Sequence, residues 1–310
     1  MNRIESLDIL KGIGIILMIV AHTFGPDNFL WDCIYTFHIP LFFIVTGFFY
    51  KQSHISILIK KNTDRLLLQY LVICLIVIIL KQIHHPHNIK EDITNAIEGM
   101  GPGCFLLAMF WSRLFFHFIL NLCPNRFLLL SLTISIGTSF IAYNNNLQSY
   151  LSLFPALVSL FFIATGYYLQ IHSFREKKCY HTPLFIIGGI IFWAITSLYG
   201  KVEMSQCIFK LSIIDFCGSL GGTYIAYKIS LFINKHDGII KKILSSAGKY
   251  SLVILFFHSI DYCIPIWHII EPYFPSSIFL FIILFLRLLF VSICLQFTLN
   301  SKLLRSFFKI

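Results

Sequence analysis

Three ionisable residues stand out in the first apolar stretch of the chain: Asp8, Lys11 and His22. A helix turns by about 100° per residue, so the step from Lys11 to His22 turns through about 1100° and leaves the two side chains about 20° apart. By the same geometry Asp8 lies about 40° from His22. All three share one face, with Lys11 and His22 about 16 Å apart along the axis.

This face suggests acid–base chemistry, because ionisable residues within a membrane are costly and face the protein interior. The hypothesis is that Lys11 holds an anionic donor and that His22 acts as a base deeper in the bilayer. A buried imidazole suits this role because desolvation keeps it neutral. The alternative for Asp8 and Lys11 is that they are interfacial anchors whose charged ends reach water.

Further polar residues lie in later apolar stretches. His38 stands in the sequence FHIPLFF, and His258 and Asp261 share a helix face at a spacing of three. Arg287 needs a partner within the membrane, and we expect a structural ion pair with Asp215 or Asp261.

The composition indicates what positions these residues. The chain has 310 residues, of which 57% are hydrophobic and only 12% charged, with a mean hydropathy of +0.79. A soluble domain averages about 25% charged residues, so we predict an all-α, polytopic integral membrane protein with one membrane-embedded domain over residues 1–310. Stretches long enough to cross the bilayer predict about ten transmembrane helices, at 7–24, 29–50, 66–83, 104–122, 127–143, 151–169, 183–199, 207–233, 250–269 and 278–299.

The basic residues set the orientation of these helices. With the N-terminus inside, sixteen of the 24 Lys and Arg residues fall in inner segments and four in outer segments. Such a bias predicts that both termini are cytoplasmic. Because the net charge of +10 follows this topology, it does not indicate nucleic acid binding.

Other motifs point away from soluble enzymes. The chain has no G-x-S-x-G, P-loop or H-E-x-x-H sequence. The tract HHPH at 84–87 resembles a metal site, but we interpret it as an exposed polar loop and predict no metal. Two similar segments, FFIVTGFFY (42–50) and FFIATGYYL (161–169), each place a Thr-Gly pair where helices can pack closely.

Taken together, several segments resemble the integral membrane acyltransferases called acyltransferase type three. The opening RIESLDILKGIGIILMIVAH has that family's Asp, basic residue and His, at Asp8, Lys11 and His22. The segments FHIPLFFIVTGFFY, KNTDRLLLQYL, PALVSLFFIATGYYL and LSSAGKYSLVILFFHS resemble the family's later motifs, the last with Gly248, Ser251 and His258. The chain departs from the pattern at Ser6, Gln69 and Cys104, where many members have Arg, Pro and Trp.

The resemblance implies an O-acetyltransferase of the cell inner membrane. The donor would be cytoplasmic acetyl-CoA, a co-substrate rather than a tightly bound cofactor, and the acceptor a cell-envelope polysaccharide or its lipid-linked precursor. His22 would be catalytic, whereas Lys11 and Arg65, with Asp8, His38 and His258, would bind substrate or donor. The alternatives are a transporter or flippase of glycan or lipid intermediates, and a glycan polymerase.

Overall fold

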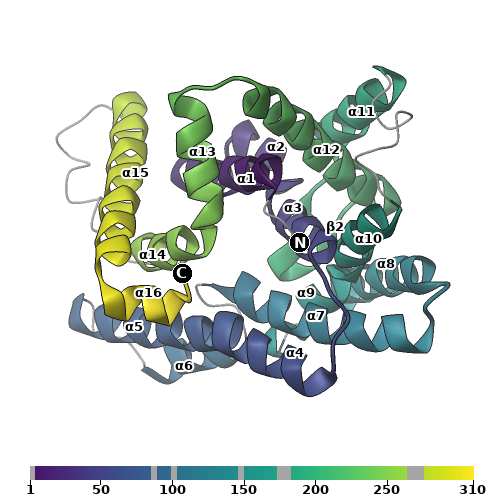
Figure 1. The fold of residues 1–310 in the computed structure, drawn as a ribbon, viewed down its shortest axis with the longest axis horizontal. Coiled ribbons are helices and arrows are strands. Elements are labelled where there is room, and N and C mark those ends of the chain that lie inside the picture. Colours follow the sequence, from purple (N-terminus) through teal and green to yellow (C-terminus); the bar gives the residue numbers. More distant parts are fainter. Residues whose placement is uncertain (1–3, 85–88, 99–102, 146–149, 173–182, 264–275) are drawn as a thin grey trace.

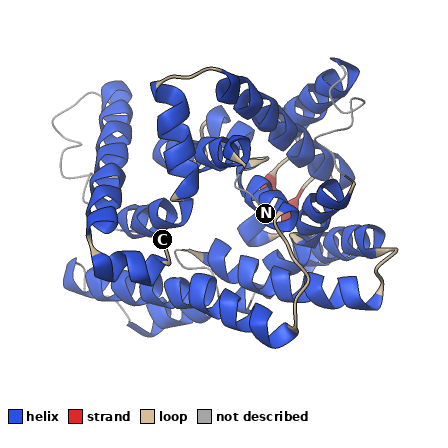
Figure 2. Ribbon diagram, in the orientation of Figure 1, coloured by secondary structure: helices blue, strands red, loops and turns tan. Residues whose placement is uncertain are grey.

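The computed structural model describes residues 4–84, 89–98, 103–145, 150–172, 183–263 and 276–310. Almost all of these residues are helical, and one small hairpin is the only β structure among them (Figure 2). The predicted all-α class is therefore confirmed.

The first half of the chain forms the helices α1 (Glu5–Phe24), α2 (Phe29–Tyr35), α3 (His38–Phe48), α4 (Ile55–Asn62), η1 (Thr63–Leu67), α5 (Leu68–His84), α6 (Ile89–Glu98), α7 (Cys104–Leu122) and α8 (Phe127–Asn145). The second half forms η2 (Tyr150–Ser152), α9 (Leu153–Val158), α10 (Leu160–Ile171), α11 (Pro183–Tyr199), β1 (Val202–Glu203), η5 (Met204–Gln206), β2 (Ile208–Phe209), α12 (Ile213–Lys235), α13 (Ile239–Lys249), α14 (Ser251–Cys263), α15 (Ser276–Asn300) and α16 (Lys302–Phe308).

Among the described residues, six helices are long and apolar enough to cross a membrane, or eight if two bent pairs each form one span. The bent pairs are η2 and α9 with α10, at 47°, and α13 with α14, at 78°. Large apolar side chains such as Phe140, Phe232 and Phe297 are exposed, which suits contact with lipid. The protein is thus polytopic, while a count of ten spans stays a prediction.

Two predicted boundaries were wrong. The eighth segment was expected to be helical from residue 207, but Cys207 lies in a turn of the hairpin with φ of 59°, and the helix begins at Ile213. The residues predicted as an inner loop before residue 250 form α13. The cause of the second error is that Lys241, Lys242 and Lys249 made an amphipathic helix look like a basic loop.

The two similar segments with a Thr-Gly pair, 42–50 and 161–169, form a close helix crossing, as predicted. A Cβ added at Gly47 of α3 would lie 2.0 Å from the carbonyl oxygen of Ile163, and one added at Gly166 of α10 would lie 1.9 Å from that of Ile44. The two helices approach with backbone against backbone, and each glycine faces the residue three before the other.

A similar crossing fixes α1, which lies between α13 and α12 (Figure 1). A Cβ at Gly12 would lie 2.0 Å from the Leu244 carbonyl oxygen, and one at Gly248 would lie 1.6 Å from that of Asp8. Because α13 is held against α1 in this way, the bend that follows Gly248 directs α14 back toward the other end of α1.

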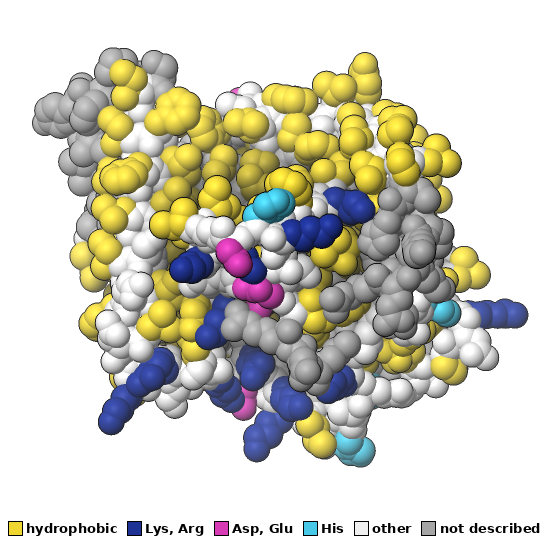
Figure 3. All heavy atoms as spheres, turned by 45° about the horizontal axis from the view of Figure 1, so that its top comes forward, with side chains coloured by type: hydrophobic (Ala, Val, Ile, Leu, Met, Phe, Trp, Pro, Cys, Tyr) yellow, Lys and Arg dark blue, Asp and Glu magenta, His cyan; other side chains and the backbone are white. Residues whose placement is uncertain are grey.

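Both ends of the described chain lie near residues that line one cavity. Lys241 Nζ of α13 is 3.3 Å from Glu5 Oε2 near the start of α1, and Lys309 near the C-terminus pairs with Asp64, next to Arg65. Lys and Arg side chains gather on the face seen in Figure 3, below a broad hydrophobic surface. This arrangement agrees with the predicted placement of the termini together, while their cytoplasmic side stays a prediction from the charge bias.

Candidate active site

The three predicted residues of α1, Asp8, Lys11 and His22, lie on one face of the helix. Lys11 Nζ lies 2.9 Å from Asp8 Oδ1 one turn away. Lys11 and His22 line the same cavity, whereas Asp8 is buried and pairs with Lys11. The predicted shared face is therefore observed.

The cavity has a volume of about 810 Å³ and runs along α1, α3, α5, α7 and α14 to the hairpin. Arg65 lies just before α5 and Lys81 near its end, which separates them by about 24 Å of helix. We call one part the basic half, lined by Lys11, Arg65, Arg113 and Lys249, and the opposite part the hairpin end, lined by Lys81, Asp92, Asn95, Glu203 and Ser205. Because Arg65 and Ser205 are both exposed, both ends reach the surface.

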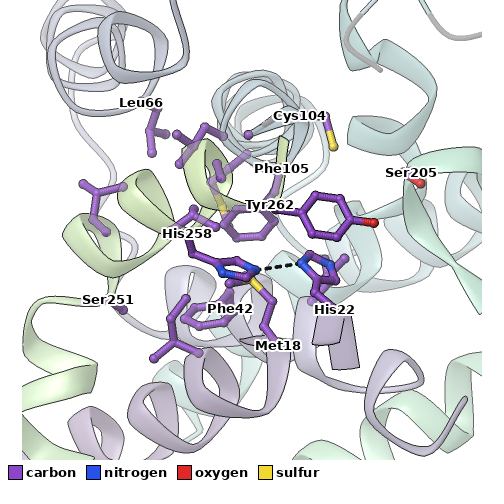
Figure 4. A pocket seen from close by; sticks show the side chains of 18 of the residues that line it. Met18, His22, Phe42, Leu66, Cys104, Phe105, Ser205, Ser251, His258 and Tyr262 are labelled. Atoms are coloured by element: carbon purple, nitrogen blue, oxygen red, sulfur yellow. Dashed lines mark hydrogen bonds between the residues drawn. The ribbon is translucent and has the colours of Figure 1, made fainter. Parts of the chain in front are cut away.

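His22 lies between these two ends, where it contacts two side chains from other helices. Its Nδ1 is 2.9 Å from His258 Nε2 on α14, and its Nε2 is 2.6 Å from the Tyr35 hydroxyl on α2. The imidazoles of His22 and His258 face each other beside the Tyr262 ring, whose centroid is 4.6 Å from that of His22 (Figure 4). Both ring nitrogens of His22 thus have a partner.

A neutral imidazole has one N–H and one lone pair, so the contacts constrain each other. With the proton of His258 on Nδ1, its Nε2 accepts from His22 Nδ1–H. His22 Nε2 then accepts from the Tyr35 hydroxyl. In this arrangement His22 Nε2 is the atom with basic character, and it points to the side where Tyr35 lies.

His258 is backed by the ion pair expected from the sequence. Its Nδ1 lies 4.0 Å from Asp261 Oδ2, and the same carboxylate oxygen lies 3.3 Å from Arg287 Nε. Arg287 also donates to the His22 carbonyl oxygen and to Thr23, both at 3.1 Å. Of the two carboxylates considered, Asp261 is therefore the partner, while Asp215 accepts from the Leu211 backbone N–H at 2.7 Å.

His38 lines the cavity in a supporting position. Its Nδ1 donates to the Ile34 carbonyl oxygen at 3.0 Å, and its ring meets the edge of Tyr35 at 4.6 Å between centroids. The Tyr35 ring also stacks on that of Trp31, with 3.6 Å between the ring centroids. The Tyr35 ring is thus clamped between two side chains, which holds its hydroxyl toward His22.

Comparison with known families identifies the reaction class. The model of one family, described as an acyltransferase domain, matches residues 4–300, nearly the whole chain. The chain belongs to the acyltransferase type 3 family. No curated protein and no solved structure matches the chain.

This membrane acyltransferase brings most of its predicted site residues to one cavity. Five of the six line it: Lys11, His22, His38, Arg65 and His258. The sixth, Asp8, contacts Lys11. The family assignment confirms the resemblance drawn from the sequence and favours acyl transfer over the transporter alternative.

Other residues of this acyltransferase cavity were missed. Tyr35, Arg113, Glu203 and Lys249 all line it. Arg113 could have been found, because an arginine inside an apolar helix is itself a pointer to function. Tyr35 and Glu203 carry no such mark, since a tyrosine in a membrane helix and a glutamate between helices are both ordinary.

The interpretation of the HHPH tract as an exposed polar loop stays a prediction. Residues 85–88 lie outside the described residues, and the side chain of His84 is not described either. Among described residues, no group of three His, Cys, Asp or Glu side chains is placed to hold a metal ion.

Proposed function

We propose that this acyltransferase moves an acetyl group from cytoplasmic acetyl-CoA to a sugar hydroxyl of a cell-envelope polysaccharide or its lipid-linked precursor. The protein would lie in the inner (cytoplasmic) membrane of the cell. The observation that carries the proposal is a single cavity with a basic half at the termini face and His22 beyond it.

The basic half suits a phosphorylated donor. Lys11 and Arg65 come from α1 and η1 and converge on the cavity. Guanidinium groups bind phosphate oxygens in pairs, and ammonium groups add a point charge. If the donor's phosphates bind beside Lys11 and Arg65, the long, thin arm of coenzyme A that ends in the thioester would reach along α1. It would span the roughly 16 Å that separate Lys11 from His22.

The hairpin end suits a hydroxyl-rich acceptor. Glu203, Ser205 and Asn95 offer a carboxylate, a hydroxyl and an amide to the cavity. Ser205 donates to Glu203 Oε1 at 2.7 Å, and burial raises the pKa of the Glu203 carboxyl. Such groups can exchange hydrogen bonds with sugar hydroxyls, so the acceptor would enter from the face opposite the termini.

The reaction can then proceed at His22 in either of two ways. As a general base, His22 Nε2 takes the proton of the acceptor hydroxyl, and the hydroxyl oxygen attacks the thioester carbonyl carbon. The carbon–sulfur bond breaks, and the thiolate leaves and takes up a proton. Alternatively His22 first accepts the acetyl group as an acyl-imidazole, which the hydroxyl then attacks.

Membrane vesicles of defined orientation test the proposal. Inside-out vesicles supplied with radiolabelled acetyl-CoA in the medium should transfer label to the envelope glycan fraction, whereas sealed right-side-out vesicles should not. Label in the glycan from right-side-out vesicles would contradict a cytoplasmic donor. Label that reaches lipid or protein but no glycan would contradict the acceptor class.

A further inference from the structure

Four Lys and Arg residues lie inside the apolar stretches predicted to cross the membrane: Lys11, Arg113, Lys228 and Arg287. Lys11 pairs with Asp8, and Arg287 pairs with Asp261 and donates two hydrogen bonds. Lys228 of α12 lies over the Tyr224 ring, 5.9 Å from its centroid. Among these four residues, Arg113 is the one without such a contact in the described structure.

Arg113 lies at the middle of α7, nine residues from each end of the helix. It lines the basic half of the cavity. Within the described structure no carboxylate forms an ion pair with it, and its buried Nε has no hydrogen-bond partner. Its side chain thus presents a positive charge to the cavity at mid-membrane depth.

Such a charge is costly unless a ligand balances it. A buried ion loses hydration, and a partner of opposite sign bound in the cavity would offset that cost. Arg65, which lines the same half of the cavity, has a charge of the same sign and so does not balance Arg113. The neighbourhood therefore increases the need for an anion.

We propose that Arg113 binds the phosphate groups of the donor, together with Arg65, and that the donor is its counter-ion. This inference rests on the proposed function, since it takes a coenzyme A thioester as the donor. A planar guanidinium can hold two phosphate oxygens at once. Its position deeper than Lys11 and Arg65 would draw the phosphorylated end into the cavity and leave the arm within reach of His22.

Thermal unfolding of the purified protein in detergent tests this role. Coenzyme A should raise the melting temperature of the wild type, while pantetheine, which has the arm without phosphates, should not. In Arg113→Met, which keeps an apolar side chain of similar length, coenzyme A should bind about tenfold to a hundredfold more weakly. Without ligand this variant should melt at or above the wild-type temperature, because an unpaired buried charge is gone.

Two further variants sharpen the comparison. Arg113→Lys keeps the charge but loses the paired contacts, so its affinity should be intermediate. Lys228→Met removes another cation within a helix, one that does not line the cavity, and should bind coenzyme A as the wild type does.

The outcomes separate the inference from its premise. If coenzyme A stabilises the wild type and Arg113→Met equally, the inference is wrong and the donor remains supported. A large fall in the melting temperature of ligand-free Arg113→Met, with unchanged affinity, would make Arg113 structural. If nanodiscs with phosphatidylglycerol stabilise the wild type but not Arg113→Met, and coenzyme A stabilises both, the anion is a lipid headgroup. If coenzyme A does not stabilise the wild type, both proposals fail.

Discussion

At the scale of single residues, the site depends on the two nitrogens of His22. One faces His258 and the other faces Tyr35, so the ring is held from both sides. This arrangement distinguishes His22 from His38, whose Nδ1 is occupied by a backbone carbonyl. The three histidines of the cavity therefore should respond differently to substitution.

We expect His22→Ala to abolish transfer without loss of inserted protein. Loss of a general base costs about a hundredfold to ten-thousandfold in rate, and loss of a covalent carrier leaves almost nothing. The measurement is glycan acetylation per unit of protein in the membrane. His38→Ala is the control and should lower protein level at least as much as activity, because His38 packs against Tyr35 and the Ile34 carbonyl.

Two results would reassign the roles. Near wild-type acetylation by His22→Ala would remove it from the reaction. Complete loss in His258→Ala, with full activity in His22→Ala, would move the catalytic role to α14.

Tyr35→Phe should lower kcat by about tenfold while leaving protein level unchanged. The substitution removes one hydrogen bond to His22 Nε2 but keeps the ring that stacks on Trp31. The measurement is kcat at saturating donor and acceptor, together with melting temperature. An unchanged kcat would mean that the hydroxyl does not orient His22.

Arg65→Ala should raise the KM for acetyl-CoA and leave the KM for the acceptor unchanged. Arg65 is exposed and lies at the mouth of the basic half, where a phosphate contact loses about tenfold in binding when removed. A matched variant, Ser205→Ala, lies at the hairpin end and should affect only the acceptor constant. The assignment fails if Arg65→Ala changes only the acceptor constant.

At the scale of elements, close helix crossings hold these residues in place. The crossing of α3 and α10 allows no side chain at Gly47 or Gly166, because a Cβ would overlap a backbone carbonyl. Backbone atoms cannot move aside as a flexible side chain can. The helices must separate if either glycine is replaced.

Gly166→Leu should therefore destabilise the fold by about 3 kcal/mol or more, by the cost of overpacking a tight interface. Thermal unfolding in detergent and the yield of membrane protein measure this effect. Gly137→Ala on α8 is the matched control, since nothing lies within 4 Å of an added Cβ there. It should be neutral or stabilising by about 1 kcal/mol through helix propensity. Equal melting temperatures for both variants would contradict the close crossing.

The sequence was informative about these elements where hydrophobicity or a small residue decides the structure. It predicted the apolar segments, the Thr-Gly crossing and the shared faces of α1 and α14. It did not predict the break between α2 and α3, where Phe37 leaves helical geometry with φ of −132°. Nor did it predict the 78° bend before Ser251, which follows a close contact of Gly248 with the backbone of the distant helix α1.

The same reason explains which site residues were predicted. Lys11, His22 and Arg287 are conspicuous as ionisable residues in apolar segments. Tyr35 reaches His22 only because α2 ends where it does and because Trp31 and His38 clamp its ring. Contacts between segments far apart in sequence have no local pattern that would reveal them.

At the scale of the whole molecule, both chain ends lie on the face that leads to the basic half of the cavity. We therefore expect a reporter fused at Ile310 to stay in the cytoplasm and one inserted directly after Asn145, at the end of α8, to be exported. The measurement is paired reporter activity, with one reporter active only inside and another only outside. An exported reporter at Ile310 would contradict the predicted orientation, because the donor site would then face away from the cytoplasm.

A cavity that reaches both faces is also a weak point in the permeability barrier of the cell. His22, Tyr35 and Tyr262 line this cavity between its two ends, and the rings of Tyr35 and Tyr262 pack against that of His22. If the proposed donor and acceptor meet at His22, the acetyl group that passes between them takes with it none of the nucleotide that activated it. Under the proposed function, the compartment outside would gain a modification whose driving energy was spent inside, and the enzyme would have to perform this transfer without letting ions leak past these rings.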